Sequence, residues 1–518
     1  SSDLGKPSGS IVDANYQTFY TTHASRTPTV YIGSNDGMLH AFYAAESATN
    51  TDNGKEQFAY VPRAISTKLN KLTNPGYVKE AYVDGSLTVS EARAYKSASS
   101  SVDWATVLVS GMGGGAKGLF ALDVTTPASF GPGNVLWEFT DADDPDMGHL
   151  LGEPKLVKLA MAGISSATPN YKWFAMVTSG YNNYTTGGSA DKQALFLLSL
   201  EKAPGAAWVL NTNYFKIYAN NGTFAAGDTS SATGMGMPGV ALGLFGNAVY
   251  AYAGDLQGNL WKFDLSGAST TWNGSTIASV LFIARTPAGI ATQQITVAPA
   301  VTLNVAGGYQ IGFGTGQFIE PPDSLVASAR QQSIYGVWDS QDGATFERIP
   351  TGSSPTVNGL ITRTLTVGTS TISITGPTFS YGTSGGAYRG WVADLSTTME
   401  RVVVDPAADS GLMAINSTVP GGDPCDSSGA SNQYRYNPNT GISFVTTGSA
   451  NTQGYLGSAS LLEVGDTAWS TRNAAGRYVV TRKVNSISPG VGGGLNAQES
   501  TVTTIAGRIS WREITNFQ

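Results

Sequence analysis

The chain has 518 residues, of which 41% are hydrophobic and 13% are charged, whereas an average globular domain has about 25% charged residues. The net charge of −7 argues against nucleic-acid binding, which depends on a basic surface. One cysteine (Cys425) and three histidines (His23, His40 and His149) argue against a zinc site of cysteine and histidine and allow no internal disulfide.

The first predicted element in chain order is a β-hairpin at residues 30–42, VYIGSNDGMLHAF. It recurs at residues 249–263, VYAYAGDLQGNLWKF, where Gly254 aligns with Gly33 and every other shared position keeps the same offset of 221. Alternating side chains on both sides of a glycine turn are typical of a hairpin. The side chains of this second copy are therefore interpreted as turn and core residues rather than as ligands.

Looser copies of the hairpin pattern follow the first one. They lie at residues 107–124, 176–199, 308–339, 390–396 and 433–441. Repeated hairpins favour radial closure, because closure protects the edges of the sheets. The repeats predict an all-β propeller of about seven blades with loop insertions, and a pair of β-sandwich domains is the structural alternative.

Other segments predict smaller elements. Short helices are expected at residues 68–75 and 324–331, an inserted β-hairpin within 351–386, and a β-rich tail beyond Gly441. The longest uncharged run, residues 234–254, contains a proline and many glycines. These residues favour buried strands over a transmembrane helix, and no transmembrane segment is predicted.

Two glycine-rich motifs resemble nucleotide-binding loops. GMGMPG at residues 234–239 is followed by strand-like sequence rather than by the helix that a dinucleotide site requires. GGGAKG at residues 113–118 lacks a serine or threonine after Lys117, so a wide hairpin turn is favoured.

The tryptophans mostly fall within strand patterns. We interpret them as packing residues rather than as a carbohydrate-stacking set: Trp104, Trp137, Trp173, Trp208, Trp261, Trp338, Trp391 and Trp511.

An acidic run follows a predicted strand. DADDPD places Asp141, Asp143, Asp144 and Asp146 within six residues, and such oxygen ligands suit Ca²⁺. The run lacks the glycine and the distal glutamate of an EF-hand loop, so a solvated acidic turn is the favoured interpretation and calcium is the alternative.

A series of motifs in order carries a family resemblance. The motifs are GSNDGMLHAF (33–42), FAYVPRA (58–64), YVDGS (82–86), KGLFALDVT (117–125), YAGDLQGNLWKFDL (252–265), FGTGQF (313–318), SIYGVWD (333–339), and DPC (423–425) followed by a Y-x-x-x-T-G turn (436–441). Together they resemble the C-terminal domain of the PilY/PilC family of type IV pilus tip-associated proteins, from about Gly33 to Arg512.

The resemblance implies a modified seven-bladed, quinoprotein-like β-propeller. It further implies one C-terminal domain, residues 1–518, of a larger protein, with a leading segment at 1–28, the main blades at 29–440, and closing strands and tail at 441–518. The start without methionine is interpreted as an excised domain or a mature product.

The implied function is that of an exported, non-enzymatic protein at the pilus tip or cell surface of a Gram-negative bacterium. It implies roles in pilus biogenesis, in the balance of extension and retraction, in twitching and in adhesion. The implied partners are minor pilins of the pilus tip complex and host or abiotic surfaces.

Members of this family often carry a calcium loop just before the YAGDLQGN motif. Here residues 241–250 contain no acidic side chain, and a plain turn is expected at residues 245–247. We therefore expect no calcium before Tyr252, and no cofactor is predicted with certainty. Any bound calcium would be sought first at the acidic run that starts at Asp141.

Two other functions compete with the pilus function. A quinone-dependent dehydrogenase shares the propeller and the repeat but commonly uses an adjacent cysteine pair, and this chain has only Cys425. A glycan-binding propeller is favoured only by the number of tryptophans. Whether Cys425 pairs with a segment outside this chain or is a free thiol is left open.

Overall fold

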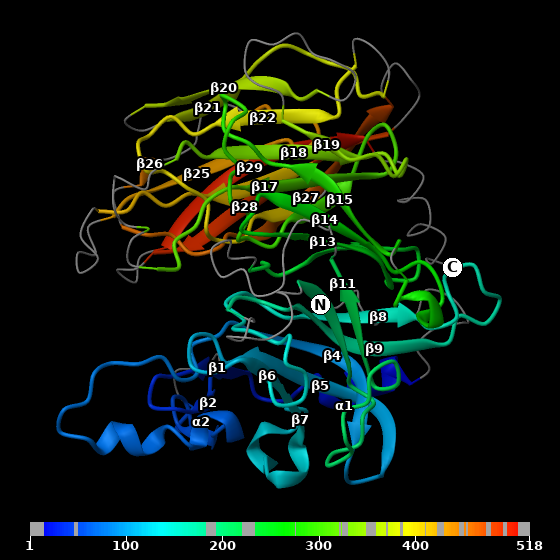
Figure 1. Ribbon diagram of the computed structural model, residues 1–518, viewed down its shortest axis with the longest axis vertical. Coiled ribbons are helices and arrows are strands. Elements are labelled where there is room, and N and C mark those ends of the chain that lie inside the picture. Colours follow the sequence, from blue (N-terminus) through cyan, green and yellow to red (C-terminus); the bar gives the residue numbers. More distant parts are fainter. Residues whose placement is uncertain are drawn as a thin grey trace. The chain divides into compact units, whose positions relative to one another are not determined.

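The computed structural model describes residues 15–45, 50–182, 193–219, 234–274, 276–320, 323, 330–348, 359–368, 371–383, 387–409, 411–421, 429–444, 450–451, 454–472, 478–490 and 495–505. Strands hold 48% of the residues and helices 7%, which confirms the all-β prediction (Figure 1). No helix in these ranges is long and apolar enough to span a membrane. The chain divides into two compact units, residues 1–255 with 261–280, and residues 256–260 with 281–518.

The first unit contains the strands up to β14 and the start of β15. These strands are β1 (Thr29–Gly33), β2 (Leu39–Tyr43), β3 (Glu56–Tyr60), β4 (Leu87–Lys96), β5 (Ser101–Gly111), β6 (Gly118–Asp123), β7 (Val135–Thr140), β8 (Lys155–Ala160), β9 (Tyr171–Thr178), β10 (Ala194–Ser199), β11 (Tyr214–Tyr218), β12 (Gly239–Leu242), β13 (Ala248–Gly254), β14 (Asn259–Asp264) and β15 (Ala278–Ile283). The sheet orders are β1-β2-β3, β4-β5-β6-β7, β11-β10-β9-β8 and β12-β13-β14-β15.

The second unit contains the remaining strands. They are β16 (Ala300–Leu303), β17 (Tyr309–Gly314), β18 (Ser333–Asp339), β19 (Phe346–Glu347), β20 (Ile361–Val367), β21 (Ile372–Thr375), β22 (Gly390–Asp394), β23 (Ala407–Asp409), β24 (Leu412–Asn416), β25 (Ser431–Tyr436), β26 (Ala450–Asn451), β27 (Ser460–Arg472), β28 (Tyr478–Pro489) and β29 (Leu495–Ile505). The sheet orders are β16-β17-β18-β22-β20-β21, β23-β24-β25-β26 and β27-β28-β29, and the end of β15 pairs with β19. The described strands thus form seven sheets, while the number of blades stays a prediction.

The two aligned hairpins are confirmed. β1 pairs antiparallel with β2, and β13 and β14 are neighbours in their sheet. Gly37 and Gly258, the aligned turn glycines, have φ of 97° and 82°, a left-handed region that side chains with a Cβ avoid. The same local geometry at both positions shows that β1 corresponds to β13 and β2 to β14.

The inserted hairpin is confirmed as well, because β20 and β21 pair antiparallel. The predicted helix at residues 68–75 is a short 3₁₀ helix, η1 (Leu69–Thr73). The helix expected at residues 324–331 lies mainly outside the described residues. The remaining helices are α2 (Arg63–Ser66), η2 (Pro127–Ser129), η3 (Pro132–Asn134), η4 (Ser269–Thr271) and α1.

The helix α1 (Tyr16–His23) was not predicted from the sequence. Asn15, a residue type common at helix starts, precedes it with φ of 71° but makes no side-chain capping bond, so the usual capping contact is missing. Tyr16 is buried, its ring lies 4.7 Å from that of Trp104, and its hydroxyl donates to Glu91 at 3.0 Å. Tertiary packing therefore holds a helix whose local sequence gives little indication of it.

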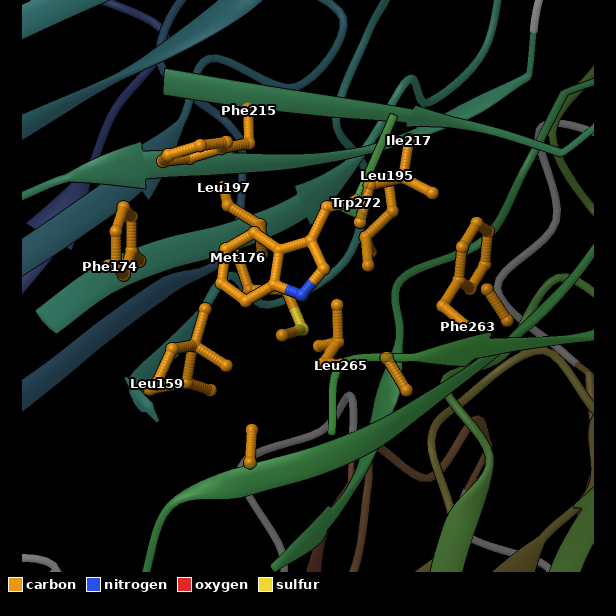
Figure 2. Packing of buried hydrophobic residues seen from close by; sticks show 14 of the residues in the cluster. Leu159, Phe174, Met176, Leu195, Leu197, Phe215, Ile217, Phe263, Leu265 and Trp272 are labelled. Carbon is orange, nitrogen blue, oxygen red and sulfur yellow. The ribbon is translucent and has the colours of Figure 1, made fainter. Parts of the chain in front are cut away.

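The core of the first unit is a cluster that joins two sheets. Strands β8 to β11 contribute Phe174, Met176 and Phe215, and β14 contributes Phe263. Figure 2 shows the Trp272 indole in the middle of the cluster, with side chains of β9, β10 and β11 around it. Its ring meets Phe215 edge-on at 5.2 Å, and its N–H has no described hydrogen-bond partner. Packing alone therefore holds this side chain.

The packing interpretation of the tryptophans is confirmed for those that the structure describes. The predicted residues with less than 9% exposure are Trp104, Trp137, Trp173, Trp261, Trp338 and Trp391. Trp208 is half-buried and donates to the carbonyl oxygen of Glu138 at 2.9 Å. Trp511 lies outside the described residues. The described tryptophans of the predicted set therefore do not form an exposed surface on which a sugar could stack.

Replacing Trp272 with alanine tests the core. Because the side chain is 1% exposed, the W272A variant should lose about 3–5 kcal/mol of unfolding free energy. Leu244→Ala, at a position that is 69% exposed, is the control and should change it by about 0.5 kcal/mol or less. Urea denaturation followed by circular dichroism measures both, and equal effects of the two substitutions would contradict the packing described.

Candidate functional site

The acidic run forms a turn directly after β7. Asp144 and Asp146 project toward β11, where Tyr214, Lys216 and Tyr218 occupy alternate positions of the strand. Side chains two residues apart lie on one face of a strand, so the three polar groups of β11 face the turn together. Phe215 and Ile217, on the other face, belong to the core. The turn therefore connects the β4–β7 sheet with the β8–β11 sheet.

Lys216 is the positive charge of this site. Its Nζ lies 2.9 Å from Oδ1 of Asp144 and 2.7 Å from Oδ2 of Asp146. The side chains of Lys216 and Asp144 are 9% and 4% exposed, so water screens this pair little. Tyr214 donates to Asp144 at 3.0 Å and Tyr218 to Asp146 at 2.8 Å. Each carboxylate thus receives both an ammonium and a phenol.

Burial and pairing act in opposite directions on the pKa of Lys216. Burial disfavours the charged ammonium, but hydrogen bonds to Asp146, Tyr218 and Asp144 outweigh it and raise the pKa above its usual 10.5. Burial, followed by the neighbouring Asp144, raises the pKa of Tyr214 to about 12. Both groups therefore keep their protons at neutral pH and remain donors to the carboxylates.

The structure does not bring all four predicted aspartates together. Asp143 accepts from the backbone N–H of Thr140 at 2.9 Å and so caps its own turn. Asp141 is exposed. In the described ranges no group of three or more histidine, cysteine, aspartate or glutamate side chains is arranged to hold a metal. Calcium at this turn stays a prediction, and it competes with a lysine that already contacts two of the carboxylates.

The turn before Tyr252 has no fit to a calcium ion. Gly243 donates its N–H to the carbonyl oxygen of Asn247 at 2.7 Å, and Gly246 takes φ of 67°, which confirms the expected plain turn. Asn247 is 2% exposed and forms a backbone bridge with Lys158 of β8. Without a carboxylate in residues 241–250, the segment lacks the charged oxygen ligands that Ca²⁺ prefers.

A second charged cluster, which the sequence did not indicate, lies on the first hairpin. Nδ1 of His40 is 2.5 Å from Oε1 of Glu56, and its Nε2 is 2.9 Å from Oδ2 of Asp36. The hydrogen bond to Glu56 raises the pKa of His40, with a further contribution from Asp36, although burial opposes the shift. The sequence showed Asp36 and His40 only as parts of the repeat. It did not indicate the cluster, because the third member, Glu56, lies on the next strand.

The two glycine-rich motifs that resemble nucleotide-binding loops have structural roles. Met235, within residues 234–239, forms a backbone bridge with Asp255, and the segment leads into β12. In residues 113–118, Gly114 donates to Asp84 at 2.9 Å within the connection from β5 to β6. Both interpretations from sequence are therefore confirmed. Cys425 lies outside the described residues.

Asp255, a residue of the YAGDLQGN motif, is a buried acceptor. It is fully buried and accepts from the indole N–H of Trp261 at 2.8 Å and from Gln193 at 3.4 Å. This carboxylate therefore fixes the tryptophan of its own hairpin. The contact agrees with the prediction that the motif contributes turn and core residues.

The comparisons with known proteins agree on one family. The family model described as the PilY1 beta-propeller domain matches residues 6–375. Type IV pilus biogenesis factor PilY1 of Pseudomonas aeruginosa PAO1 is 34% identical over 476 residues, which are 84% of this chain and 36% of that protein. A PilY1 homolog of Xylella fastidiosa Temecula1 is 36% identical over 340 residues, 63% of this chain and 20% of that protein. The chain thus spans about a third or less of these relatives.

A solved structure covers nearly the whole chain. The crystal structure of the Pseudomonas aeruginosa PilY1 C-terminal domain is 25% identical, with a TM-score of 0.63, and the match covers 97% of this chain and 99% of that one. This likeness supports the β-propeller fold that the repeats predicted.

Removing Lys216 tests the acidic turn. In Lys216→Met the two carboxylates lose their shared counter-ion, and the unfolding free energy should fall by about 3–5 kcal/mol. Lys155→Met is the matched control, because Lys155 and its partner Glu153 have side chains 29% and 46% exposed, and it should cost about 1 kcal/mol or less. Calcium should raise the melting temperature of K216M and leave that of the unsubstituted protein unchanged. Equal stabilisation of both by calcium would show that Lys216 does not occupy the cation position.

His40 gives the protein a pH-dependent contribution to stability. Because its folded pKa is raised above 6.5, the stabilisation is complete below pH 6.5 and is lost as pH rises through the raised pKa. His40→Gln should therefore lower the melting temperature at mildly acidic pH and have little effect at alkaline pH. His23→Gln is the control for loss of a histidine elsewhere. A His40→Gln effect that grows with pH would contradict the pairing.

Proposed function

The chain belongs to the PilY1 β-propeller family, and on this premise we propose that it is a non-enzymatic component of type IV pilus biogenesis. The observation that carries the proposal is the family match over residues 6–375, together with relatives that are named type IV pilus biogenesis factors. Because the chain spans only 36% of the PAO1 relative, the proposal takes residues 1–518 as one C-terminal propeller domain of a longer protein.

The proposal includes a location and partners. The protein is exported to the surface of a Gram-negative cell and acts at the pilus tip with minor pilins. It supports adhesion to host or abiotic surfaces, twitching, and the balance of pilus extension and retraction. The names of the relatives support the pilus part of this proposal, and the family resemblance of the motifs supports the rest.

The chemistry of the described sites suits a rigid scaffold. Asp144 and Asp146 are paired with Lys216, and Asp255 accepts a hydrogen bond from Trp261. The carboxylates of the turn join two sheets rather than line an open cavity. A scaffold of this kind supports binding through its loops and edges, which agrees with a role in assembly rather than in catalysis.

We further propose that this protein is regulated without calcium at the turn before Tyr252. The support is the residues themselves: residues 241–250 have no carboxylate, and Asn247 is buried against β8. A calcium requirement of pilus extension in this system would then have to arise at another site.

The alternatives have lost specific support. The glycan hypothesis depended on tryptophans, and most of the predicted set is buried. The quinone hypothesis lacks the adjacent cysteine pair. No observation on the described residues favours either one over the pilus function.

Deleting the encoding gene in its own host tests the proposal. We expect fewer surface pili and reduced twitching, measured by shearing of surface pilin and by the diameter of the twitching zone, because assembly lacks a biogenesis factor. Complementation with the full-length gene should restore both, and complementation with a copy that lacks residues 1–518 should not. Normal piliation and twitching in the deletion strain would contradict the proposal.

A further inference from the structure

Among the described residues, the sheet that contains β1 has no counterpart of β12, which belongs to the equivalent sheet. β1 corresponds to β13 and β2 to β14, and β12 lies beside β13 on the side away from β14. In the β1-β2-β3 sheet no described strand occupies the corresponding position beside β1. The internal repeat therefore identifies a strand position that the described chain leaves open.

The backbone of β1 presents hydrogen-bonding groups to this open position. Ala44 donates to the carbonyl oxygen of Pro28 at 2.9 Å, and Ser34 donates to that of Met38 at 2.9 Å. In an antiparallel pair, hydrogen-bonded and non-hydrogen-bonded residues alternate, so Val30 and Ile32 bond to β2. Thr29 and Tyr31 then point their N–H and C=O groups away from β2, and no described strand pairs with them.

A cavity of about 410 Å³ adjoins β1. Thr29 and Tyr31 line it, with Ala24 and Arg26 of the preceding segment and Val89 and Glu91 of β4. The guanidinium of Arg26 lies 3.6 Å from the carboxylate of Glu91 and donates to Thr106 at 2.6 Å. The charges in the lining thus have partners within the protein, which leaves backbone groups and apolar side chains for a ligand.

β1 also lacks the usual protection of an edge strand. Its sequence, TVYIG, contains no charge and no proline, although natural edge strands commonly carry one of these against unwanted pairing. Val30 and Ile32 are 52% and 54% exposed. An unprotected edge beside a cavity is the arrangement found where a strand is added from outside.

We propose that this edge is a strand-acceptor site, which takes one extended, uncharged segment of a partner protein into the cavity beside β1. The segment pairs antiparallel with Thr29 and Tyr31, as β12 does with β13 at the equivalent residues Tyr250 and Tyr252. Backbone hydrogen bonds supply the affinity, and alternate side chains enter the cavity. This inference does not depend on the pilus function.

The walls of the cavity favour a single strand over a second folded copy of this chain. α1 with the segment that follows it, β4, and residues 124–127 border the cavity, so a segment entering it must leave its own sheet. The strand that fills the equivalent position, β12, has the sequence GVAL. Small and β-branched residues without charge are accordingly the chemistry that this site accepts.

Hydrogen exchange on the free protein provides the first test. The amides of Val30 and Ile32 should exchange slowly and those of Thr29 and Tyr31 fast, and this alternation within one strand is its own control. Slow exchange at Thr29 and Tyr31 in the free protein would overturn the proposal. If protection of the Thr29 and Tyr31 amides then fades on dilution, a second copy of this chain occupies the edge. If it does not depend on concentration, a segment of this chain itself occupies the edge.

A labelled peptide with the sequence of residues 237–244, MPGVALGL, provides the second test. It should bind, as measured by fluorescence anisotropy, and protect the amides of Thr29 and Tyr31 from exchange. The same peptide with proline in place of the valine should not bind, because it cannot complete the ladder. No binding of MPGVALGL would overturn the acceptor site.

Two variants of the protein locate the binding. Ala24→Trp fills the cavity from an exposed position and should abolish binding, whereas Thr22→Trp, two residues earlier on α1 and outside the lining, should not change it. Thr29→Pro removes one outward N–H and should weaken binding about 2- to 10-fold. Peptide binding that Ala24→Trp leaves unchanged would show that the peptide binds elsewhere and would overturn the proposal.

Discussion

The strands at the centre of these sheets are apolar on both faces, and the rest of the first unit depends on covering them. Every residue of β6 and of β10 is buried, although successive side chains of a strand point to opposite faces. Each such strand therefore needs a layer on either side. The cluster around Trp272 covers one face of β10, because it joins residues of the β8–β11 sheet to residues of β13 and β14.

Polar contacts connect a different pair of sheets, the β4–β7 sheet and the β8–β11 sheet. The acidic turn meets Lys216 across two sheets with two short ion pairs in a site of low exposure. Removing charges from water costs free energy, so a buried ion pair adds little net stability. A buried charge that has lost its partner is strongly destabilising. The turn therefore contributes more to fixing the relative position of the two sheets than to the free energy of their contact.

The β1-β2-β3 sheet departs from this scheme. It shares the hairpin of the repeat, with the same left-handed glycine in its turn, yet its first strand borders a cavity instead of another strand. The turn before Tyr252, by contrast, is closed by a backbone hydrogen bond between Gly243 and Asn247, and Asn247 is buried.

The sequence alone determined the hairpins, their repeat and the family, because a glycine turn between alternating strands is a local signal that a few neighbouring residues specify. It also predicted no calcium before Tyr252, because residues 241–250 contain no carboxylate. Only the tertiary structure brought Lys216 to Asp144 and Asp146, which lie about 70 positions earlier, and Glu56 to His40. It likewise revealed α1, which Tyr16 holds against Trp104 and Glu91 without a capping contact. Contacts between distant segments depend on how whole sheets stack, and no local pattern encodes that stacking.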